Sequence, residues 1–301
     1  MVRLLHTTGN GKFEETRTYN IPDTKQDEIR VRAVMTGVCR SDIAMMNGDF
    51  GMLPLHMQGH EGLGQVIQAR KNCGEGVSVG DYVATRGEPA YADEYNVKAD
   101  QYVKVPMADP KWILEPVACG INCVIQAKKN INENSKRAVI IGSGFLAKIV
   151  YQTLRIEYPN LSIDVIGKSN EDFFSKNGSP LLIDFDGKYD IVVDLKEDDR
   201  VFARDCTNEN AVIILATEKP NGVSTTFASM LWKACTIVFP SPRADTFYLS
   251  MILARNWIQD GKLVVDNFWD RGYNRDTEWQ KAFEDADNRN GDYGRGYIVW
   301  D

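Results

Sequence analysis

The stretch Gly142-Ser143-Gly144-Phe145-Leu146-Ala147 decides the fold that we predict for this chain. It has the spacing G-x-G-x-x-A and lies between an apolar run at 136–141 and a segment at 146–154 whose apolar residues recur with helical spacing. In such a turn the first glycine permits the sharp bend, the second lets the backbone approach a pyrophosphate, and the small third residue lets the helix pack closely on the strand. The pattern predicts a dinucleotide-binding turn at a helix N-terminus, where negative charge is favoured. The alternative is an ordinary strand-to-helix turn.

Apolar runs typical of buried strands continue on the C-terminal side of this turn. They recur at 162–166, 190–194, 211–216 and 235–239, separated by short polar segments. Strands of this kind that alternate with helices predict a parallel sheet covered on both faces, which is an α/β fold with a doubly wound Rossmann sheet. The chain after Lys168 is short, so we expect helices on one face of this sheet to be missing or reduced.

The N-terminal side of the turn has a different pattern. Residues 28–34 alternate polar and apolar side chains, and similar alternation recurs around 64–69 and 102–105 with glycine-rich turns between the segments. Several short strands of this kind predict a compact, barrel-like β domain. With roughly 150 residues per domain, the length of 301 residues predicts two domains. We place the β-rich domain at 1–118 together with 265–301, and the dinucleotide-binding domain at 119–264.

Composition and charge exclude several classes of protein. With 43% hydrophobic and 26% charged residues the chain is expected to fold rather than remain disordered. A formal charge of −7 gives no overall attraction to nucleic acid or to anionic lipid, so we expect a small-molecule partner and neither a nucleic acid nor a membrane. No apolar run approaches the roughly 18 residues of a membrane span and no signal-peptide pattern is present, so we expect a cytoplasmic protein. Six cysteines are too few for a disulfide scaffold.

The residues after the second predicted Rossmann strand bear on the choice of nicotinamide cofactor. NAD-specific sites usually place an acidic residue at this strand end, where it accepts hydrogen bonds from the ribose. Here Ile166 is followed by a glycine, Lys168 and Ser169. A cation and a hydroxyl can hold a 2′-phosphate, so the sequence favours NADP(H) over NAD(H). The alternative is that Lys168 is merely solvated and that Glu171 or Asp172 binds the ribose.

A second group of residues has the chemistry of a metal site. Cys39, His60, Glu61 and Glu115 offer one thiolate, one imidazole and two carboxylates, a mixed set that suits zinc. A catalytic zinc site needs three protein ligands and an open position. Taken singly, each residue is commonplace, because a lone cysteine is more often part of a core and a Gly-His-Glu sequence is often a turn. His60 is nevertheless conspicuous, since the chain has only three histidines and this one lies between a glycine and a carboxylate.

These motifs together resemble the zinc-dependent medium-chain dehydrogenases. The resemblance extends over nearly the whole chain and keeps the family's order: Gly37-Val38-Cys39-Arg40-Ser41-Asp42, Gly59-His60-Glu61-Gly62, Val79–Val83, Tyr91–Tyr95, the G-x-G-x-x-A turn and Arg295–Val299. Glu115-Pro116 is similar to the branch of sorbitol, polyol and glucose dehydrogenases. The segment 154–168 is also similar to ribitol-5-phosphate dehydrogenases of that branch, which use NADPH. The resemblance implies a GroES-like catalytic domain beside the Rossmann domain.

The resemblance also implies roles for individual residues. Cys39 and His60 are expected to bind zinc, and either Glu61 or Glu115 is expected to complete the ligand set. Asp42 would orient the ligand imidazole from outside the metal's ligand shell.

Three further sets of residues receive roles in the same way. Ser41 would pass on the proton of the reacting hydroxyl, so that Ser41, Glu61 and Glu115 form the expected catalytic set. Arg40 would approach the pyrophosphate of the cofactor. The remaining cofactor contacts are expected from the turn and the strand end: Gly142, Gly144, Ala147, Lys168 and Ser169.

Two departures from the family pattern change what we expect. Relatives with a structural zinc carry a four-cysteine lobe, but here residues 86–93 join the strands without a cysteine, so we expect one catalytic zinc and no structural zinc. The histidine that completes the proton relay in many alcohol dehydrogenases is replaced by Ala44, so the proton must leave through water or another side chain.

The sequence therefore predicts a zinc-dependent, NAD(P)-linked oxidoreductase that interconverts a secondary alcohol or polyol and its ketone. One alternative is a sugar-phosphate reductase of the ribitol-5-phosphate dehydrogenase type, for which Arg86 and Arg243 are candidate phosphate-binding cations. Another is a dinucleotide-binding relative without catalysis. The family commonly pairs through an edge strand such as 235–239, which implies a homodimer or a tetramer, but the residue types do not choose between these states.

Overall fold

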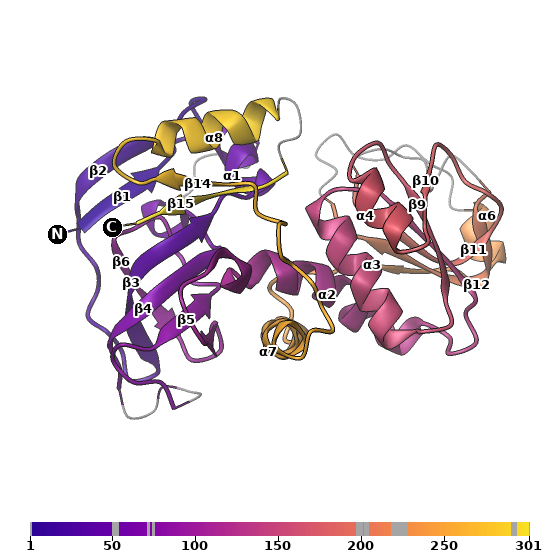
Figure 1. Cartoon of the computed structure of the whole chain (residues 1–301), viewed down its shortest axis with the longest axis horizontal. Coiled ribbons are helices and arrows are strands. Elements are labelled where there is room, and N and C mark those ends of the chain that lie inside the picture. The colour runs from indigo at the N-terminus through magenta and orange to yellow at the C-terminus, as the bar shows by residue number, and fades with distance from the viewer. Residues whose placement is uncertain are drawn as a thin grey trace. The chain divides into compact units, whose positions relative to one another are not determined.

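The chain forms two compact units in the computed structural model (Figure 1). Unit 1 contains residues 1–116 and 251–301, and unit 2 contains residues 117–250. The sequence analysis places the corresponding limits at 118 and 265. The structure describes residues 2–49, 54–70, 73, 76–196, 201, 205–217, 228–289 and 294–300.

Unit 2 is built on a six-stranded parallel sheet with the strand order β10-β9-β8-β11-β12-β13. Numbered along the chain within this sheet, that order is 3-2-1-4-5-6, which is the order of a Rossmann domain. The predicted doubly wound α/β fold is confirmed. The strands are β8 (Arg137–Ile141), β9 (Ser162–Ile166), β10 (Leu181–Leu182), β11 (Tyr189–Asp194), β12 (Thr207–Leu215) and β13 (Thr236–Val238). The helices are α2 (Glu115–Ala127), α3 (Phe145–Glu157), α4 (Glu171–Lys176), α6 (Ala228–Trp232) and the first residues of α7 (Thr246–Gln259).

Different helices cover the two faces of this sheet. Along β8, Ala138 and Ile140 pack with residues of α2, α3 and α4, whereas Val139 and Ile141 face the side that contains Met230 of α6. Because side chains of a strand alternate between its faces, a strand covered on both sides must be apolar throughout. The uninterrupted apolar run that the sequence shows at β8 follows from this double coverage.

The chain after Lys168 is shortened, as predicted. Helix α4 has six residues and β10 has two. Residues 183–188, which lead from β10 to β11, contain no helix.

Unit 1 is built on a seven-stranded sheet with the order β14-β15-β3-β4-β5-β7, in which β6 also pairs with β3. Helix α8 packs on α1, β14 and β15 (Figure 1). The strands are β3 (Glu28–Gly37), β4 (Gly62–Gln68), β5 (Tyr82–Thr85), β6 (Glu94–Lys98), β7 (Tyr102–Val105), β14 (Arg271–Asn274) and β15 (Gly296–Val299), with a separate hairpin of β1 (Val2–His6) and β2 (Glu14–Tyr19). The helices of unit 1 are α1 (Arg40–Met46), η1 (Leu55–Met57), η2 (Pro110–Trp112), most of α7, and α8 (Trp279–Asn288). The short helix η3 (Lys128–Asn130) belongs to unit 2.

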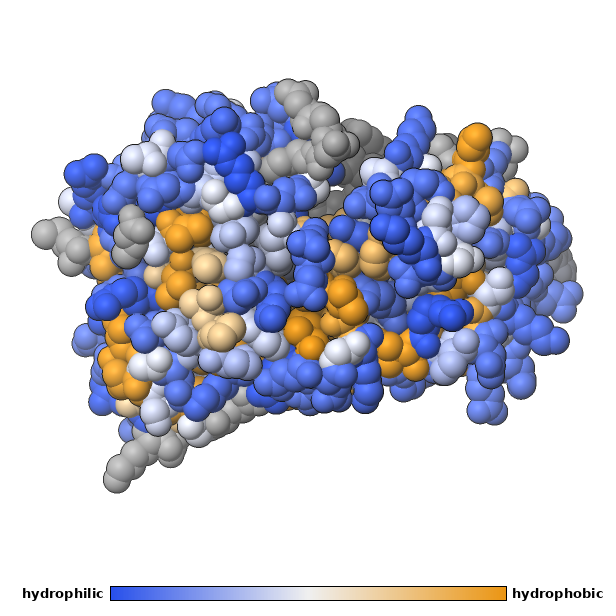
Figure 2. Space-filling view, in the orientation of Figure 1, coloured by the Kyte–Doolittle hydropathy of each residue, from blue (hydrophilic) through white to orange (hydrophobic). Residues whose placement is uncertain are grey.

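Polar side chains dominate the face shown in Figure 2, and apolar side chains form small separate patches on it. Across the described part of the chain, no helix combines the length and the apolar character needed to cross a membrane.

Candidate functional site

Three of the predicted metal ligands converge in unit 1. Cys39 follows β3 and precedes the first turn of α1, while His60 and Glu61 immediately precede β4. Strands β3 and β4 pair antiparallel, with Thr36 opposite Gly62, so the chain leaves β3 and enters β4 at the same end of the sheet. One ligand atom of Cys39, one of His60 and one of Glu61 lie within 4.8 Å of one another.

A buried carboxylate lies beside the imidazole of His60. Oδ1 of Asp42 lies 3.7 Å from Nδ1 of His60, and the Asp42 side chain is 1% exposed. Its other oxygen accepts hydrogen bonds from the Tyr91 hydroxyl at 2.7 Å and from the backbone N–H of Cys39 at 2.8 Å. Nε2 of His60 is then the ring nitrogen that approaches Glu61, at 4.0 Å from Oε1. An imidazole oriented through Nδ1 by a carboxylate is a common way to present Nε2 to a metal.

The charges around His60 favour a cation at this point. Burial by itself lowers the pKa of His60, but a hydrogen bond with the Cys39 thiol and the nearby carboxylates of Asp42 and Glu115 raise that pKa well above its ordinary value. The same anionic surroundings that stabilise a proton on the ring stabilise a metal ion that replaces it.

The two carboxylate oxygens of Glu61 have different surroundings. Oε1 is paired with the guanidinium of Arg295. Oε2 is buried and accepts no hydrogen bond from any residue that the structure describes. A Cβ atom at Gly37 would lie 2.1 Å from Oε2, so the missing side chain of Gly37 makes room for the carboxylate. Buried polar atoms are rarely left without a partner. An acceptor of this kind beside a thiol and an imidazole fits a bound zinc ion.

Glu115 lies near this group of three ligands but is not part of it. It begins α2 and is 2% exposed. Burial raises the pKa of Glu115 to about 7, and Glu61 also raises it, while His60, Arg295 and Arg86 lower it. The structure therefore brings Glu115 within electrostatic range of His60 and Glu61, without including it among the ligand atoms that converge.

Arg295 and Tyr91 belong to this site, although the sequence analysis gave neither of them a role. The backbone N–H of Arg295 donates to Asp270 at 2.7 Å, and its guanidinium carbon lies 5.4 Å from the centre of the Trp269 ring. Burial disfavours the charge of Arg295, but Glu61, Cys39 and Glu115 raise its pKa above the ordinary value. Both residues lie inside motifs that were used only to identify the family, and no local pattern distinguishes them.

Arg40 and Ser41 occupy the first turn of α1, directly after Cys39. Arg40 is exposed and Ser41 is half-buried.

The predicted cofactor turn in unit 2 has the expected local geometry. Gly142 has a φ of +117°, a conformation that side chains disfavour, and follows directly on β8. A Cβ atom at Gly144 would meet no atom within 4 Å among the described residues, so the backbone there is open to a ligand. Ala147 is 1% exposed and packs in the core between α3 and the sheet. These features fit the pyrophosphate of a dinucleotide at the N-terminus of α3.

The strand end at β9 presents a cation. Lys168 and Ser169 are exposed, and Lys168 forms no ion pair with any described residue. Glu171, the alternative ribose ligand, is engaged elsewhere, because its Oε1 accepts hydrogen bonds from Ser175 Oγ at 2.6 Å and from the backbone N–H of Leu181 at 3.3 Å.

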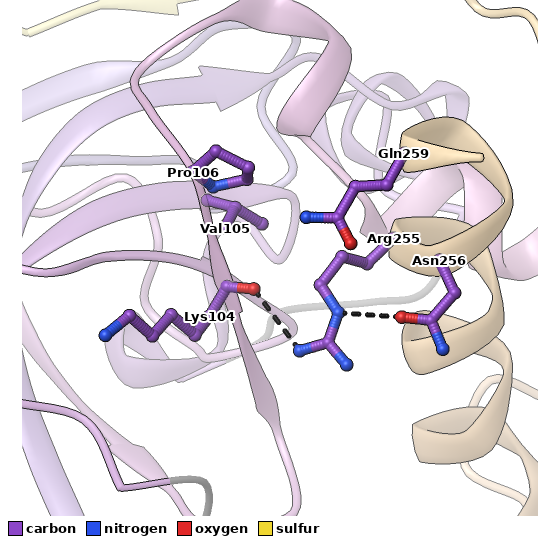
Figure 3. A pocket seen from close by; sticks show the side chains of 6 residues that line it. All are labelled: Lys104, Val105, Pro106, Arg255, Asn256 and Gln259. Carbon is purple, nitrogen blue, oxygen red and sulfur yellow. Dashed lines mark hydrogen bonds between the residues drawn. The ribbon is translucent and has the colours of Figure 1, made fainter. Parts of the chain in front are cut away.

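A polar groove elsewhere on unit 1 lies between the end of β7 and α7 (Figure 3). Several of its polar groups bond to one another or to neighbours. Arg255 donates to the backbone oxygen of Lys104 at 3.5 Å and to Oδ1 of Asn256 at 3.1 Å, and Nζ of Lys104 pairs with Asp81 at 2.7 Å. We assign no role to this groove.

Sequence comparison identifies relatives of part of this chain. Residues 25–107 match the family model of the alcohol dehydrogenase GroES-like domain. Alcohol dehydrogenase 1 of Caenorhabditis elegans is 39% identical over 72 residues, which is 23% of this chain and 20% of that protein. An alcohol dehydrogenase of Schizosaccharomyces pombe is 32% identical over 114 residues, which is 34% of this chain and 30% of that protein. The matches thus span about a third or less of the length of these curated relatives.

Solved structures share the fold of the whole chain. TarJ of S. aureus in complex with NADPH is 20% identical with a TM-score of 0.76, and covers 100% of both chains. Alcohol dehydrogenase TADH of Thermus sp. ATN1 is 14% identical with a TM-score of 0.79 and 100% coverage of both chains. Acetophenone reductase of Geotrichum candidum in complex with NAD is 15% identical with a TM-score of 0.77, covering 99% of this chain and 97% of the other. Residues 25–107 therefore resemble the GroES-like domain of alcohol dehydrogenases, and the whole chain has the fold that these solved structures share.

Proposed function

We propose that this protein is a zinc-dependent, NAD(P)-linked oxidoreductase that interconverts a secondary alcohol or polyol and the corresponding ketone. The observation that carries the proposal is the convergence of Cys39, His60 and Glu61 within 4.8 Å, with a buried carboxylate oxygen that lacks a hydrogen-bond donor among the described residues. The match of residues 25–107 to the alcohol dehydrogenase GroES-like domain supports oxidoreductase chemistry.

Cys39 and His60 would hold zinc, with Glu61 as the third ligand through Oε2. Glu115 is the alternative third ligand, because it is buried within electrostatic range of both His60 and Glu61. Zinc, when bound, supplies Lewis-acid polarisation of a substrate oxygen, and the nicotinamide ring accepts or donates the hydride.

Side chains of unit 1 would orient the ligands and handle protons. Asp42, whose Oδ1 lies 3.7 Å from Nδ1 of His60, would keep the ring in the orientation that presents Nε2. Ser41 takes the proton of the substrate hydroxyl and passes it to water, since Ala44 offers no relay. A pKa of about 7 lets Glu115 accept or release a proton near neutral pH.

In unit 2, Gly142, Gly144 and Ala147 would form the turn that binds the cofactor pyrophosphate. We propose NADP(H) as the preferred cofactor, because Lys168 is a cation without an ion pair among the described residues, while Oε1 of Glu171 accepts hydrogen bonds from Ser175 and Leu181. Ser169 would add a hydroxyl to the same 2′-phosphate site.

Metal analysis of the purified protein tests this proposal. We expect about one zinc per chain, lost in Cys39→Ser and retained in Cys235→Ser, which replaces another half-buried cysteine. A protein that binds NADPH but contains no zinc would contradict the proposal and favour a dinucleotide-binding relative without catalysis.

A sugar-phosphate reductase is a second candidate, favoured by one observation. Arg86 lies close enough to Glu115 to lower its pKa, so a cation lies beside the proposed metal site. Arg243 is exposed in unit 2. Hydride transfer should be assayed with ribitol 5-phosphate and with ribitol, and equal rates would exclude this candidate.

We also propose that the protein self-associates through unit 2. Strand β13 pairs only with β12 among the described strands, and the neighbouring side chains of Leu231, Trp232 and Phe239 are 76%, 86% and 69% exposed. Trp232 is thus not a core residue. Unpaired strand edges and exposed apolar side chains favour association. Light scattering should give the mass of an oligomer, and a monomeric mass would contradict this proposal.

A further inference from the structure

We propose that Ser143 is a positioning residue that sets the preference for a 2′-phosphorylated cofactor. It would do so by fixing the loop 167–170, which carries Lys168. This inference rests on the proposed function, since it takes the G-x-G-x-x-A turn to bind a nicotinamide dinucleotide.

The Ser143 side chain is tied to the end of β9. It is the middle residue of the G-x-G element and is 5% exposed. Its Oγ accepts hydrogen bonds from the backbone N–H groups of Lys168, at 3.1 Å, and Ser169, at 3.0 Å. The hydroxyls of Ser143 and Ser169 also lie 3.1 Å apart, and the Asn170 side-chain amide donates to the backbone oxygen of Ser143 at 2.8 Å. The turn that faces the pyrophosphate and the loop that faces the ribose are therefore one bonded unit.

Gly167 leaves the space that the Ser143 side chain occupies. A Cβ atom at Gly167 would lie 2.2 Å from Oγ and 2.3 Å from Cβ of Ser143. Any other residue at this position would displace the Ser143 hydroxyl from the two N–H groups that it accepts. The glycine after β9 and the serine in the turn thus form a matched pair.

Ser143 and Gly167 together fix the backbone of Lys168, the cation that we propose selects NADPH. Lys168 is exposed and has no ion pair among the described residues, so its side chain can bind a phosphate. Fixing its backbone before the ligand binds removes part of the ordering cost of that contact. NADH has no 2′-phosphate and makes no such contact, so the benefit of Ser143 should be confined to NADPH.

Titrations of the full chain with NADPH and NADH, followed by fluorescence and calorimetry, test the proposal. In Ser143→Ala we expect the Kd for NADPH to rise about fivefold, the factor that corresponds to one net hydrogen bond, with little change in the Kd for NADH. Ser162→Ala, which removes an exposed serine hydroxyl at the other end of β9, should change neither value. In a background that carries both Lys168→Ala and Ser169→Ala the effect of Ser143→Ala should vanish, because Ser143 acts through these two side chains of the loop.

Gly167→Ala provides a second route to the same result if Ser143→Ala does not fold. We expect the same selective loss of NADPH affinity, and retained NADH binding shows that unit 2 is intact. An equal loss of NADPH and NADH affinity, or an effect of Ser143→Ala that persists without the side chains of Lys168 and Ser169, would overturn the inference and leave the proposed function standing. Binding of neither cofactor to the unaltered protein would overturn both.

Discussion

The two candidate ligand sites of this protein are built on opposite principles. The candidate metal site in unit 1 combines polar side chains from distant segments, such as Cys39, Glu61 and Arg295, and includes the buried ion pair of Glu61 with Arg295. The cofactor turn in unit 2 combines backbone groups and small residues from two adjacent strand ends, and its cation, Lys168, is exposed. We therefore expect substitutions in the first site to affect folding and metal binding together, and substitutions in the second to affect ligand binding with little effect on folding.

The largest effect on stability should come from breaking the pair of Glu61 and Arg295. Their side chains are 1% and 11% exposed, and removing one partner of a buried pair leaves an uncompensated charge. In zinc-free protein we expect Arg295→Met to lower the free energy of unfolding by about 3–5 kcal/mol, measured by urea denaturation.

The pair of Arg271 and Glu278 in the same unit is the matched control. Its side chains are 43% and 34% exposed, so Arg271→Met should cost only about 0–1 kcal/mol. Similar losses for the two variants would show that the metal site does not depend on buried charge. The double variant Arg295→Met with Glu61→Gln should recover part of the loss.

The next largest effect should come from Tyr91→Phe. This change removes the 2.7 Å hydrogen bond to Asp42 and loosens the carboxylate that orients His60. We expect zinc affinity, measured by competition with a chelator, to fall about 10–100-fold, as is usual for partners outside the ligand shell. Tyr95→Phe removes a buried hydroxyl that bonds to Thr85 at 2.8 Å and should leave zinc affinity unchanged. Equal zinc affinity in Tyr91→Phe and the unaltered protein would contradict the proposal that Tyr91 acts on His60 through Asp42.

A smaller effect should appear as pH dependence of the zinc-free protein. Burial raises the pKa of Glu115 from 4.5 to about 7, so the folded state binds this proton more tightly than the unfolded chain does. The contribution of Glu115 to stability is therefore fully present below pH 4.5 and is lost as the pH rises to about 7. Urea unfolding across this range should show a decline that is weaker in Glu115→Gln. His60 also has a raised pKa, so the comparison of the two proteins, rather than the slope itself, isolates Glu115. Identical slopes would show that Glu115 is solvated.

The same contrast explains what the sequence could predict. Strand β9 has the predicted bounds, and β8 begins one residue later than predicted. These strands could be predicted because burial on both faces requires a local run of apolar residues. Cys39, His60 and Glu61 were named as a group because they occur in short motifs. The role of Arg295 depends on the register of β15 against β3, with Tyr297 opposite Gly37, and that register is not visible in either strand alone. Ser143 was passed over because the turn motif directs attention to its glycines.

Gly144→Ala should have the smallest effect on folding and should act mainly on cofactor binding. A Cβ atom there meets nothing within 4 Å, so the free energy of unfolding should change by less than about 1 kcal/mol, the scale of replacing an N-cap glycine by alanine. Gly142→Ala should cost more, because its φ of +117° is strained for any side chain. Titration should show that Gly144→Ala weakens NADPH and NADH alike, since the added methyl group occupies the approach of the pyrophosphate that both cofactors share. Unchanged affinity for both would mean that the open backbone at Gly144 does not face the cofactor, and that the turn only connects β8 to α3.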